Sequence, residues 1–287
     1  MKGPVVITNA ANLLGRAVVE TALFQGWPTI AVSNDAAALE ALRERHQGTQ
    51  LVTLAGSTVD ETRSAALAAA LRELDRPIAG IVIADVGEPR RGRLLDLPAQ
   101  ELLNRIDAEL LPQIAAARHL LPLLAASGRN GSYVVVGSPG SEHPWAGYGA
   151  RSVGAAAVNM LTRVLHDEAR AFGVRVQLLA PSRPVRTDEN RACACDGWPT
   201  ASAIAEKALA LIEQAEPRNS ADAVVRFASA PSRASANNVT HAVETPSSTT
   251  SEASIGDVDP SSQRVLDQTW HALEPILSSI RESGERK

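Results

Sequence analysis

Residues 5–16 decide the fold, and they read Val5-Val6-Ile7-Thr8-Asn9-Ala10-Ala11-Asn12-Leu13-Leu14-Gly15-Arg16. Three β-branched apolar residues open the stretch, as in a short buried strand. A helical pattern follows over Leu13–Gln25, with its apolar residues on one face. A strand that passes through a tight turn directly into a helix is typical of the first βαβ unit of a parallel sheet.

The same alternation of short β-rich runs and longer helical patterns continues along the 287-residue chain. Short connections between such elements predict an α/β fold with a doubly wound parallel sheet of about seven strands, in three α/β/α layers. Asp60 is the expected N-cap of the third helix. The expected strands are Pro4–Thr8, Thr29–Ser33, Gln50–Leu54, Ile78–Ala84, Ser132–Val136, Val174–Leu179 and Ala223–Phe227. The expected helices are Leu13–Gln25, Ala36–His46, Asp60–Leu74, Pro98–Ala126, Tyr148–Phe172 and Ile204–Gln214.

The composition favours a cytoplasmic globular protein. Hydrophobic residues make up 45% of the chain, which is enough for a sizeable core, and the formal net charge is −4. The lack of a basic excess argues against nucleic-acid or anionic-membrane binding. No apolar run approaches the roughly 20 residues of a membrane span. The two cysteines, Cys193 and Cys195, provide no disulfide framework.

The amino-acid composition changes near residue 228. Residues 229–262 are rich in Ser, Thr, Ala and Pro, and we interpret them as a flexible segment after a main domain of residues 1–228. An amphipathic helix is expected over 263–283, where Leu266, Trp270 and Leu277 belong to one apolar stripe. The stripe favours docking on the chain's own core or on a twin subunit, and a dedicated partner-binding helix is the alternative.

Four motifs in the expected order resemble those of the short-chain dehydrogenase/reductase (SDR) family, and this likeness implies a Rossmann-type domain. The turn at residues 8–15 is similar to the family's T-G-x-x-x-G-x-G. Gly131–Ser138 looks like a strand that ends in the catalytic serine, and Tyr148–Ser152 like the Y-x-x-x-K segment. Val174–Ser182 followed by Thr187 resembles the strand that ends in P-G…T.

The positions that this resemblance assigns to the cofactor depart from the family's residues. Asn9 and Leu13 replace the first two glycines, and Asn9 is expected to keep the turn because asparagine tolerates a positive φ. Ser33 and Asn34 stand where an acid or a base selects NAD or NADP. The expected cofactor is therefore none, or weakly bound NAD(P)(H). The cofactor positions are Thr8, Asn9, Leu13, Leu14, Gly15, Ser33, Asn34, Ser57, Ala84, Gly87, Pro181 and Thr187.

The catalytic positions are also only partly kept. The resemblance gives Ser138 the carbonyl-orienting role and Tyr148 the proton-transfer role, and it puts Ser152 where the family has lysine. Arg151 is adjacent but should point about 100° away along the helix. Glu109 occupies the position of the family's catalytic asparagine.

These losses predict a non-catalytic or strongly impaired SDR protein that acts by ligand or partner binding, as a scaffold, sensor or partner subunit. The alternative is an atypical NAD(P)(H)-dependent oxidoreductase that uses Tyr148 and Ser138. The family resemblance implies a homodimer or homotetramer built on the 98–126 and 148–172 helices, and a protein partner is a further possibility.

Three other groups of residues are weaker candidates. Ser138, Ser141, Glu142 and His143 suggest a hydrolase, but no G-x-S-x-G elbow surrounds them. Cys193-x-Cys195 is half of a soft metal site, and the expectation is that no metal binds. Arg90-Arg91-Gly92-Arg93 could hold an anion, although a solvated loop is the simpler interpretation.

Overall fold

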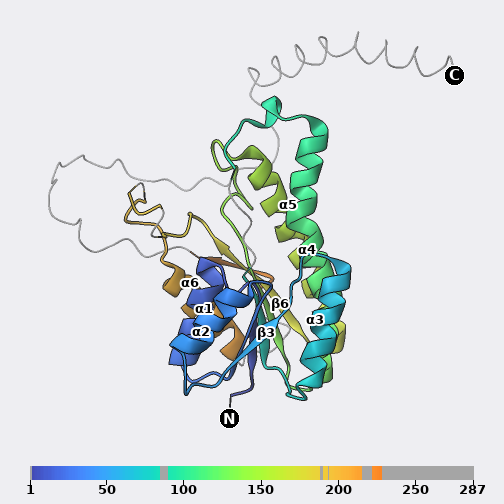
Figure 1. The fold of residues 1–287 in the computed structure, drawn as a ribbon. Coiled ribbons are helices and arrows are strands. Elements are labelled where there is room, and N and C mark those ends of the chain that lie inside the picture. Colours follow the sequence, from blue (N-terminus) through green and yellow to red (C-terminus); the bar gives the residue numbers. More distant parts are fainter. Residues whose placement is uncertain (1, 85–89, 188–189, 193, 215–221, 228–287) are drawn as a thin grey trace, which may run out of the picture. The chain divides into compact units, whose positions relative to one another are not determined.

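The computed structural model describes residues 2–84, 90–187, 190–192, 194–214 and 222–227. Its centre is a sheet of seven parallel strands in the order β3-β2-β1-β4-β5-β6-β7 (Figure 1). This confirms the predicted doubly wound sheet. The strands are β1 (Val5–Ile7), β2 (Thr29–Ser33), β3 (Leu51–Ala55), β4 (Gly80–Ile83), β5 (Ser132–Val136), β6 (Arg175–Pro181) and β7 (Val224–Phe227).

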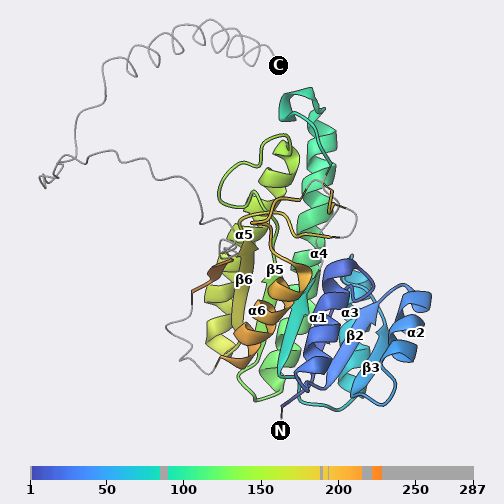
Figure 2. The same ribbon diagram turned by 90° about the vertical axis from the view of Figure 1, so that its left-hand side faces the viewer.

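Helices cover both faces of the sheet, with α1, α2 and α6 on one side and α3, α4 and α5 on the other (Figures 1 and 2). Two separate apolar cores result, one under each helical layer. The helices are α1 (Leu13–Phe24), α2 (Ala36–Arg45), α3 (Glu61–Glu73), α4 (Ala99–Ala126), α5 (Gly149–Ala169) and α6 (Ala201–Glu213), with 3₁₀ turns η1 (Leu94–Asp96) and η2 (Arg170–Phe172).

The central strands are apolar at almost every position because both of their faces are covered. All five residues of β2 and all five of β5 are buried, and these two strands have the predicted bounds. The predicted helix over 148–172 is shorter in the structure. Tyr148 has non-helical dihedral angles, and the chain leaves α5 through η2 and a left-handed Gly173.

The strand order reverses between β1 and β4, which makes the carboxyl ends of these two strands the topological switch point of the sheet. Ligands of doubly wound folds bind at this switch point. The flexible segment predicted at 229–262 and the helix predicted at 263–283 lie outside the described residues. Among the helices described, none has the length and apolar character needed to cross a membrane.

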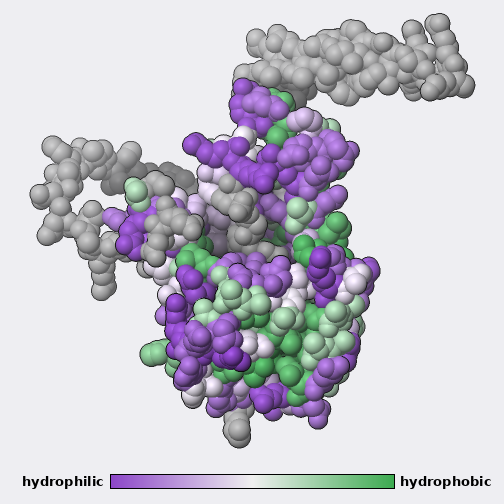
Figure 3. Space-filling view, viewed as in Figure 1, coloured by the Kyte–Doolittle hydropathy of each residue, from purple (hydrophilic) through white to green (hydrophobic). Residues whose placement is uncertain are grey.

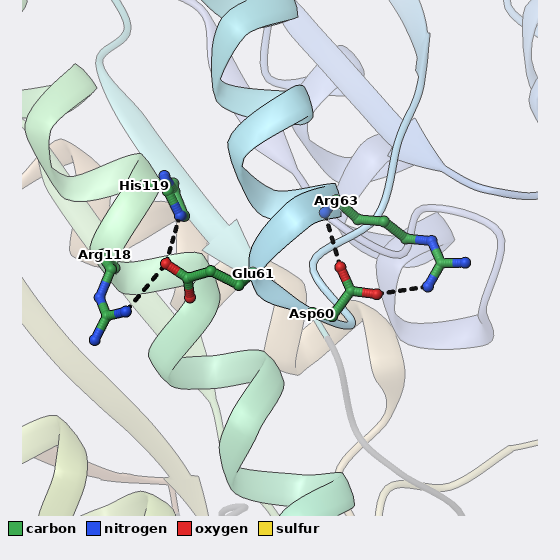
Figure 4. A network of polar contacts seen from close by, with 5 residues as sticks. All are labelled: Asp60, Glu61, Arg63, Arg118 and His119. Atoms are coloured by element: carbon green, nitrogen blue, oxygen red, sulfur yellow. Dashed lines mark hydrogen bonds and ion pairs between the residues drawn. The ribbon is translucent and has the colours of Figure 1, made fainter.

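Charged side chains connect the start of α3 to the middle of α4 (Figure 4). The Glu61 carboxylate lies 2.7 Å from His119 Nε2 and accepts a hydrogen bond of 3.1 Å from Arg118 Nη1. The hydrogen bond with His119, followed by the contact with Arg118, lowers the pKa of Glu61. Asp60 is the N-cap of α3, as predicted, and accepts from the backbone N–H of Arg63.

Candidate functional site

The turn between β1 and α1 keeps its shape without two of its glycines. Asn9 has a φ of 51°, as expected for a residue that replaces glycine in the left-handed region. Gly15 remains essential, because a Cβ there would lie 2.2 Å from the backbone oxygen of Asn9. Asn12 closes the turn, since its side chain accepts from the Gly15 N–H at 2.6 Å and donates to the Ala84 carbonyl at 2.8 Å.

The same turn fits a pyrophosphate poorly. Backbone N–H groups at a helix N-terminus bind phosphates when they are available. Here the N–H of Gly15 is already used by Asn12, and Leu13, half-buried, supplies a side chain where the family has a glycine. The packing role of the turn is therefore preserved, whereas its phosphate-binding role is weakened.

A cavity of about 210 Å³ lies beside the turn, at the ends of β2 and β3. It brings together five of the predicted cofactor positions. Its described lining contains hydroxyl and amide groups but no charged side chain. These groups can form hydrogen bonds with an uncharged adenosine, but none of them is the acid or base that would select between NAD and NADP. It is lined by Thr8, Asn9, Val32, Ser33, Asn34, Gly56, Ser57, Thr58 and Val59.

The other predicted cofactor positions are not part of this cavity. Leu14 is buried in the core under α1, and Ala84 follows β4 and accepts from Asn12. Pro181 ends β6, and Thr187 forms a local turn in which its N–H donates to Asn190 Oδ1 at 2.8 Å. Gly87 lies outside the described residues.

A second, smaller cavity of about 50 Å³ lies beside Ser138. Residues from α4, from α5 and from the end of β5 line it, and Figure 2 labels these three elements. Ser138 is buried, as are the residues of α5 that face it. The lining residues are Ala108, Glu109, Gln113, Val136, Gly137, Ser138, Ser141, Arg151, Ala155, Val158 and Leu178. The α5 residues in this set, Arg151, Ala155 and Val158, follow the spacing of one helical face.

An ion pair occupies the wall of the small cavity. Arg151 Nη1 lies 3.2 Å from Glu109 Oε1, and their side chains are only 5% and 20% exposed. Burial raises the pKa of Glu109, and the nearby Arg151 opposes that rise only in part. The carboxylate also needs Gly154, because a Cβ there would lie 2.6 Å from Glu109 Oε2. The site thus contains a partly buried carboxyl group with a raised pKa next to a buried arginine.

The expectation that Arg151 points away from the site is wrong. The expectation took Ser152 as the position that faces the site and placed Arg151 about 100° away from it, but Arg151 lines the cavity beside Ser138 and Ser152 is not in its described lining. The Tyr148 ring stacks on Trp145 at 4.0 Å between centroids and is absent from the described lining of the small cavity.

Ser152, which was assigned to the lysine position, holds the preceding loop. Its Oγ accepts from the Trp145 N–H at 2.9 Å and donates to the Tyr148 carbonyl at 3.1 Å. Sequence reasoning therefore missed Arg151 and Ala155 as residues that line the site. The spacing of the residues could have identified them: small Ala155 follows Arg151 by four positions and apolar Val158 follows Ala155 by three, which is the spacing of one helical face.

The weaker candidates are not assembled into sites by the described residues. Glu142 forms an ion pair with Arg226 of β7 at 2.7 Å, so its carboxylate is directed at an arginine rather than at a serine–histidine pair. Cys195 is exposed, and Cys193 is outside the described part of the chain. In the described ranges, no group of three or more His, Cys, Asp or Glu side chains is suited to holding a metal ion.

A doubly wound sheet with a helix-capping turn at its switch point and cavities at the carboxyl ends of its strands defines a Rossmann-type α/β protein. The family model described as short chain dehydrogenase matches residues 4–194, which is more than half of the chain. The chain belongs to this short-chain dehydrogenase family. No curated protein shows significant similarity to it.

Solved structures share the fold at low sequence identity. A short-chain dehydrogenase from Streptomyces avermitilis has 21% identity and a TM-score of 0.66, covering 79% of this chain and 88% of its own. An NADPH-bound short-chain oxidoreductase from Pseudomonas aeruginosa PAO1, described as containing an atypical catalytic center, has 21% identity, a TM-score of 0.69 and coverages of 80% and 97%. An alcohol dehydrogenase from Thermococcus sibiricus, complexed with 5-hydroxy-NADP, has 20% identity, a TM-score of 0.66 and coverages of 81% and 99%.

Proposed function

We propose that this chain is a ligand-binding SDR protein in which the family's tyrosine–lysine proton transfer is absent. The observation that carries the proposal is the inward face of α5, where Arg151 and Ala155 line the cavity beside Ser138 with the spacing of four that the family gives to tyrosine and lysine. An arginine keeps its proton at neutral pH and an alanine has none to give. Ordinary NAD(P)-dependent turnover is therefore not expected from this site.

The cofactor side supports the same proposal. The uncharged cavity near Ser33 suits an adenosine, but the Gly15 N–H is used by Asn12, and Leu13 replaces a glycine. A lost charge-assisted phosphate contact costs about 1.5–3 kcal/mol, or roughly 10–100-fold in affinity. We infer that NAD(P)(H) binds weakly.

Calorimetric titration of the full chain with NAD⁺, NADH, NADP⁺ and NADPH tests this proposal together with a turnover assay on simple aldehydes and ketones. We expect dissociation constants of about 1 mM or weaker, since the phosphate contacts are lost. Tight binding and steady turnover that disappears in Ser138→Ala would refute a purely ligand-binding role.

A second candidate is an atypical oxidoreductase, favoured by the pairing of a buried Ser138 with the Glu109 carboxyl in one cavity. In this candidate the Glu109 carboxyl, whose pKa is raised by burial, would be the group beside Ser138 that exchanges a proton with a carbonyl oxygen, and a nicotinamide cofactor would supply the hydride chemistry. The NADPH-bound Pseudomonas relative with an atypical catalytic center makes this chemistry worth testing. Turnover that falls with rising pH and disappears in Glu109→Gln, but persists in Tyr148→Phe, would favour this candidate over the first.

We also infer self-association through α4 and α5. Both helices carry large apolar side chains that remain exposed in the single chain: Leu103, Leu111, Val153, Met160 and Val164. Exposed apolar residues gathered on two packed helices are typical of a protein–protein interface. Light scattering should give a dimer or tetramer at micromolar concentration, and Met160→Glu should shift it toward the monomer. A monomeric parent protein would refute the inference.

A further inference from the structure

A larger cavity, of about 370 Å³, opens next to the small one, between Arg90, the first half of α4 and the first turn of α5. The two cavities share Ala108, Glu109 and Arg151, so the buried ion pair forms part of both walls. The described lining has no large apolar side chain, which favours a small polar ligand. It consists of Arg90, Glu101, Asn104, Arg105, Ala108, Glu109, Ala150 and Arg151.

The charged lining favours an anion. Among the described lining residues, three arginines face two glutamates, a formal excess of one positive charge. Both glutamates are already engaged by arginines: Glu101 Oε1 accepts from Arg105 Nε at 2.8 Å, and Glu109 Oε1 lies 3.2 Å from Arg151 Nη1. Arg90 forms no ion pair with any described residue. A cation would have to displace an arginine, whereas an anion would not.

Hydrogen-bond donors remain available at this cavity. A guanidinium has five N–H donors in a planar fork, and the contact with Glu101 uses only the Nε–H of Arg105. Its Nη groups can bind two oxygens of one carboxylate or phosphate, which is the geometry that arginine favours. The Asn104 side-chain oxygen accepts from Gln100 Nε2 at 3.1 Å, so its amide group is left to donate.

From these donors and this charge, we propose that the cavity binds a small ligand through its carboxylate or phosphate group. Arg90 and Arg105 bind the anionic group at the mouth of the cavity, and Arg151 adds positive potential at its inner wall. The sequence of the arginine-rich segment Arg90–Arg93 allowed two interpretations, an anion site or a solvated loop. The proposal favours the first of these for Arg90. The inference rests on the proposed ligand-binding function and names the chemical class of its ligand. Figure 3 shows hydrophilic residues over much of the part of the molecule formed by the N-terminal halves of α4 and α5.

Calorimetric titration of the full chain at pH 7 with malonate, inorganic phosphate and sulfate, without any dinucleotide, tests the proposal. We expect one saturable site, with malonate and phosphate showing which oxyanion is preferred and glycerol as the neutral comparison that does not bind. Arg105→Gln and Arg90→Gln should each weaken binding about tenfold or more, because each removes charge-assisted hydrogen bonds.

The matched control is Arg43→Gln on α2, since Arg43 also pairs with a glutamate one turn earlier, Glu40, but lies outside the cavity. Its affinity for the anion should equal that of the parent chain, and thermal unfolding verifies that all three variants are folded. The proposal is overturned if no saturable binding occurs below about 50 mM, or if the anion binds equally well to the parent and to both cavity variants. Because no turnover or dinucleotide enters this experiment, its failure is distinct from a failure of the proposed function.

Discussion

Neutralising the two partners of the Glu109–Arg151 pair one at a time should destabilise the protein unequally. Glu109→Gln leaves a guanidinium whose side chain is 5% exposed. Because arginine keeps its proton in proteins, the charge stays buried and loses the Glu109 carboxylate as an ion-pair partner. Removing one partner of a buried pair in this way costs about 3–5 kcal/mol.

Arg151→Gln should cost less, because a carboxyl group can take up a proton. Burial already holds the pKa of Glu109 above its ordinary value of 4.5, and loss of Arg151 removes the interaction that lowers it. The folded state of this variant then binds more protons than the unfolded state. Its stability therefore falls as the pH rises from 4.5 to the folded pKa, by about 1.4 kcal/mol for each pH unit in that window.

Thermal unfolding of the two variants, of the double variant and of an exposed control between pH 4 and pH 8 measures this asymmetry. One kcal/mol shifts the Tm of a domain of this size by about 2–4 °C, so Glu109→Gln should lower it by about 6 °C or more. The control is Glu40→Gln, whose pair with Arg43 is exposed and contributes less than about 0.5 kcal/mol. Equal and additive losses in the two single variants, or no pH dependence in Arg151→Gln, would refute the account of the pair.

Three further changes probe the turn and the α3–α4 contact. Asn12→Ala removes two hydrogen bonds and should lower the free energy of unfolding in urea by about 2 kcal/mol. The control Asp35→Ala removes a single N-cap hydrogen bond and should lower it by about 1 kcal/mol, so equal losses would contradict the bridging role of Asn12. Gly15→Ala places a Cβ 2.2 Å from the backbone oxygen of Asn9 and should prevent folding or cost about 3 kcal/mol or more, visible as lost expression or a lowered Tm; a neutral result would show that the turn can move. Glu61 has a lowered pKa and stabilises the fold above pH 4.5, so Glu61→Gln should flatten the loss of stability seen on acidification below that value; an unchanged acid-unfolding curve would contradict this.

The fold could be predicted from the sequence because its signals are local. The strands of a covered parallel sheet are apolar throughout, so β2 and β5 have the predicted bounds, and the capping residue Asp60 marks the start of α3. The positive φ of Asn9 also follows from its residue type alone. Each of these features depends on a residue and its close neighbours in the chain.

The site was harder to predict because its geometry depends on contacts between distant segments. Arg151 is charged and lies within a helix, which by itself favours an exposed position. It is buried because Glu109, 42 residues earlier on α4, provides a counter-charge, and because Gly154 leaves space for that carboxylate. A motif centred on the aromatic Tyr148 pointed instead to a residue that precedes the helix.

The missing Cβ of Gly154 also restricts the order in which this site can change. With Glu109 in place, a Cβ at position 154 would lie 2.6 Å from Glu109 Oε2, so a larger residue there requires the carboxylate to shift. Shortening Glu109 first opens that space, but it removes the carboxylate that pairs with the buried Arg151 until position 151 changes as well. Each of the three residues thus makes the others harder to replace. A laboratory effort to install a tyrosine–lysine pair at positions 151 and 155 of α5 should therefore exchange positions 109 and 151 together.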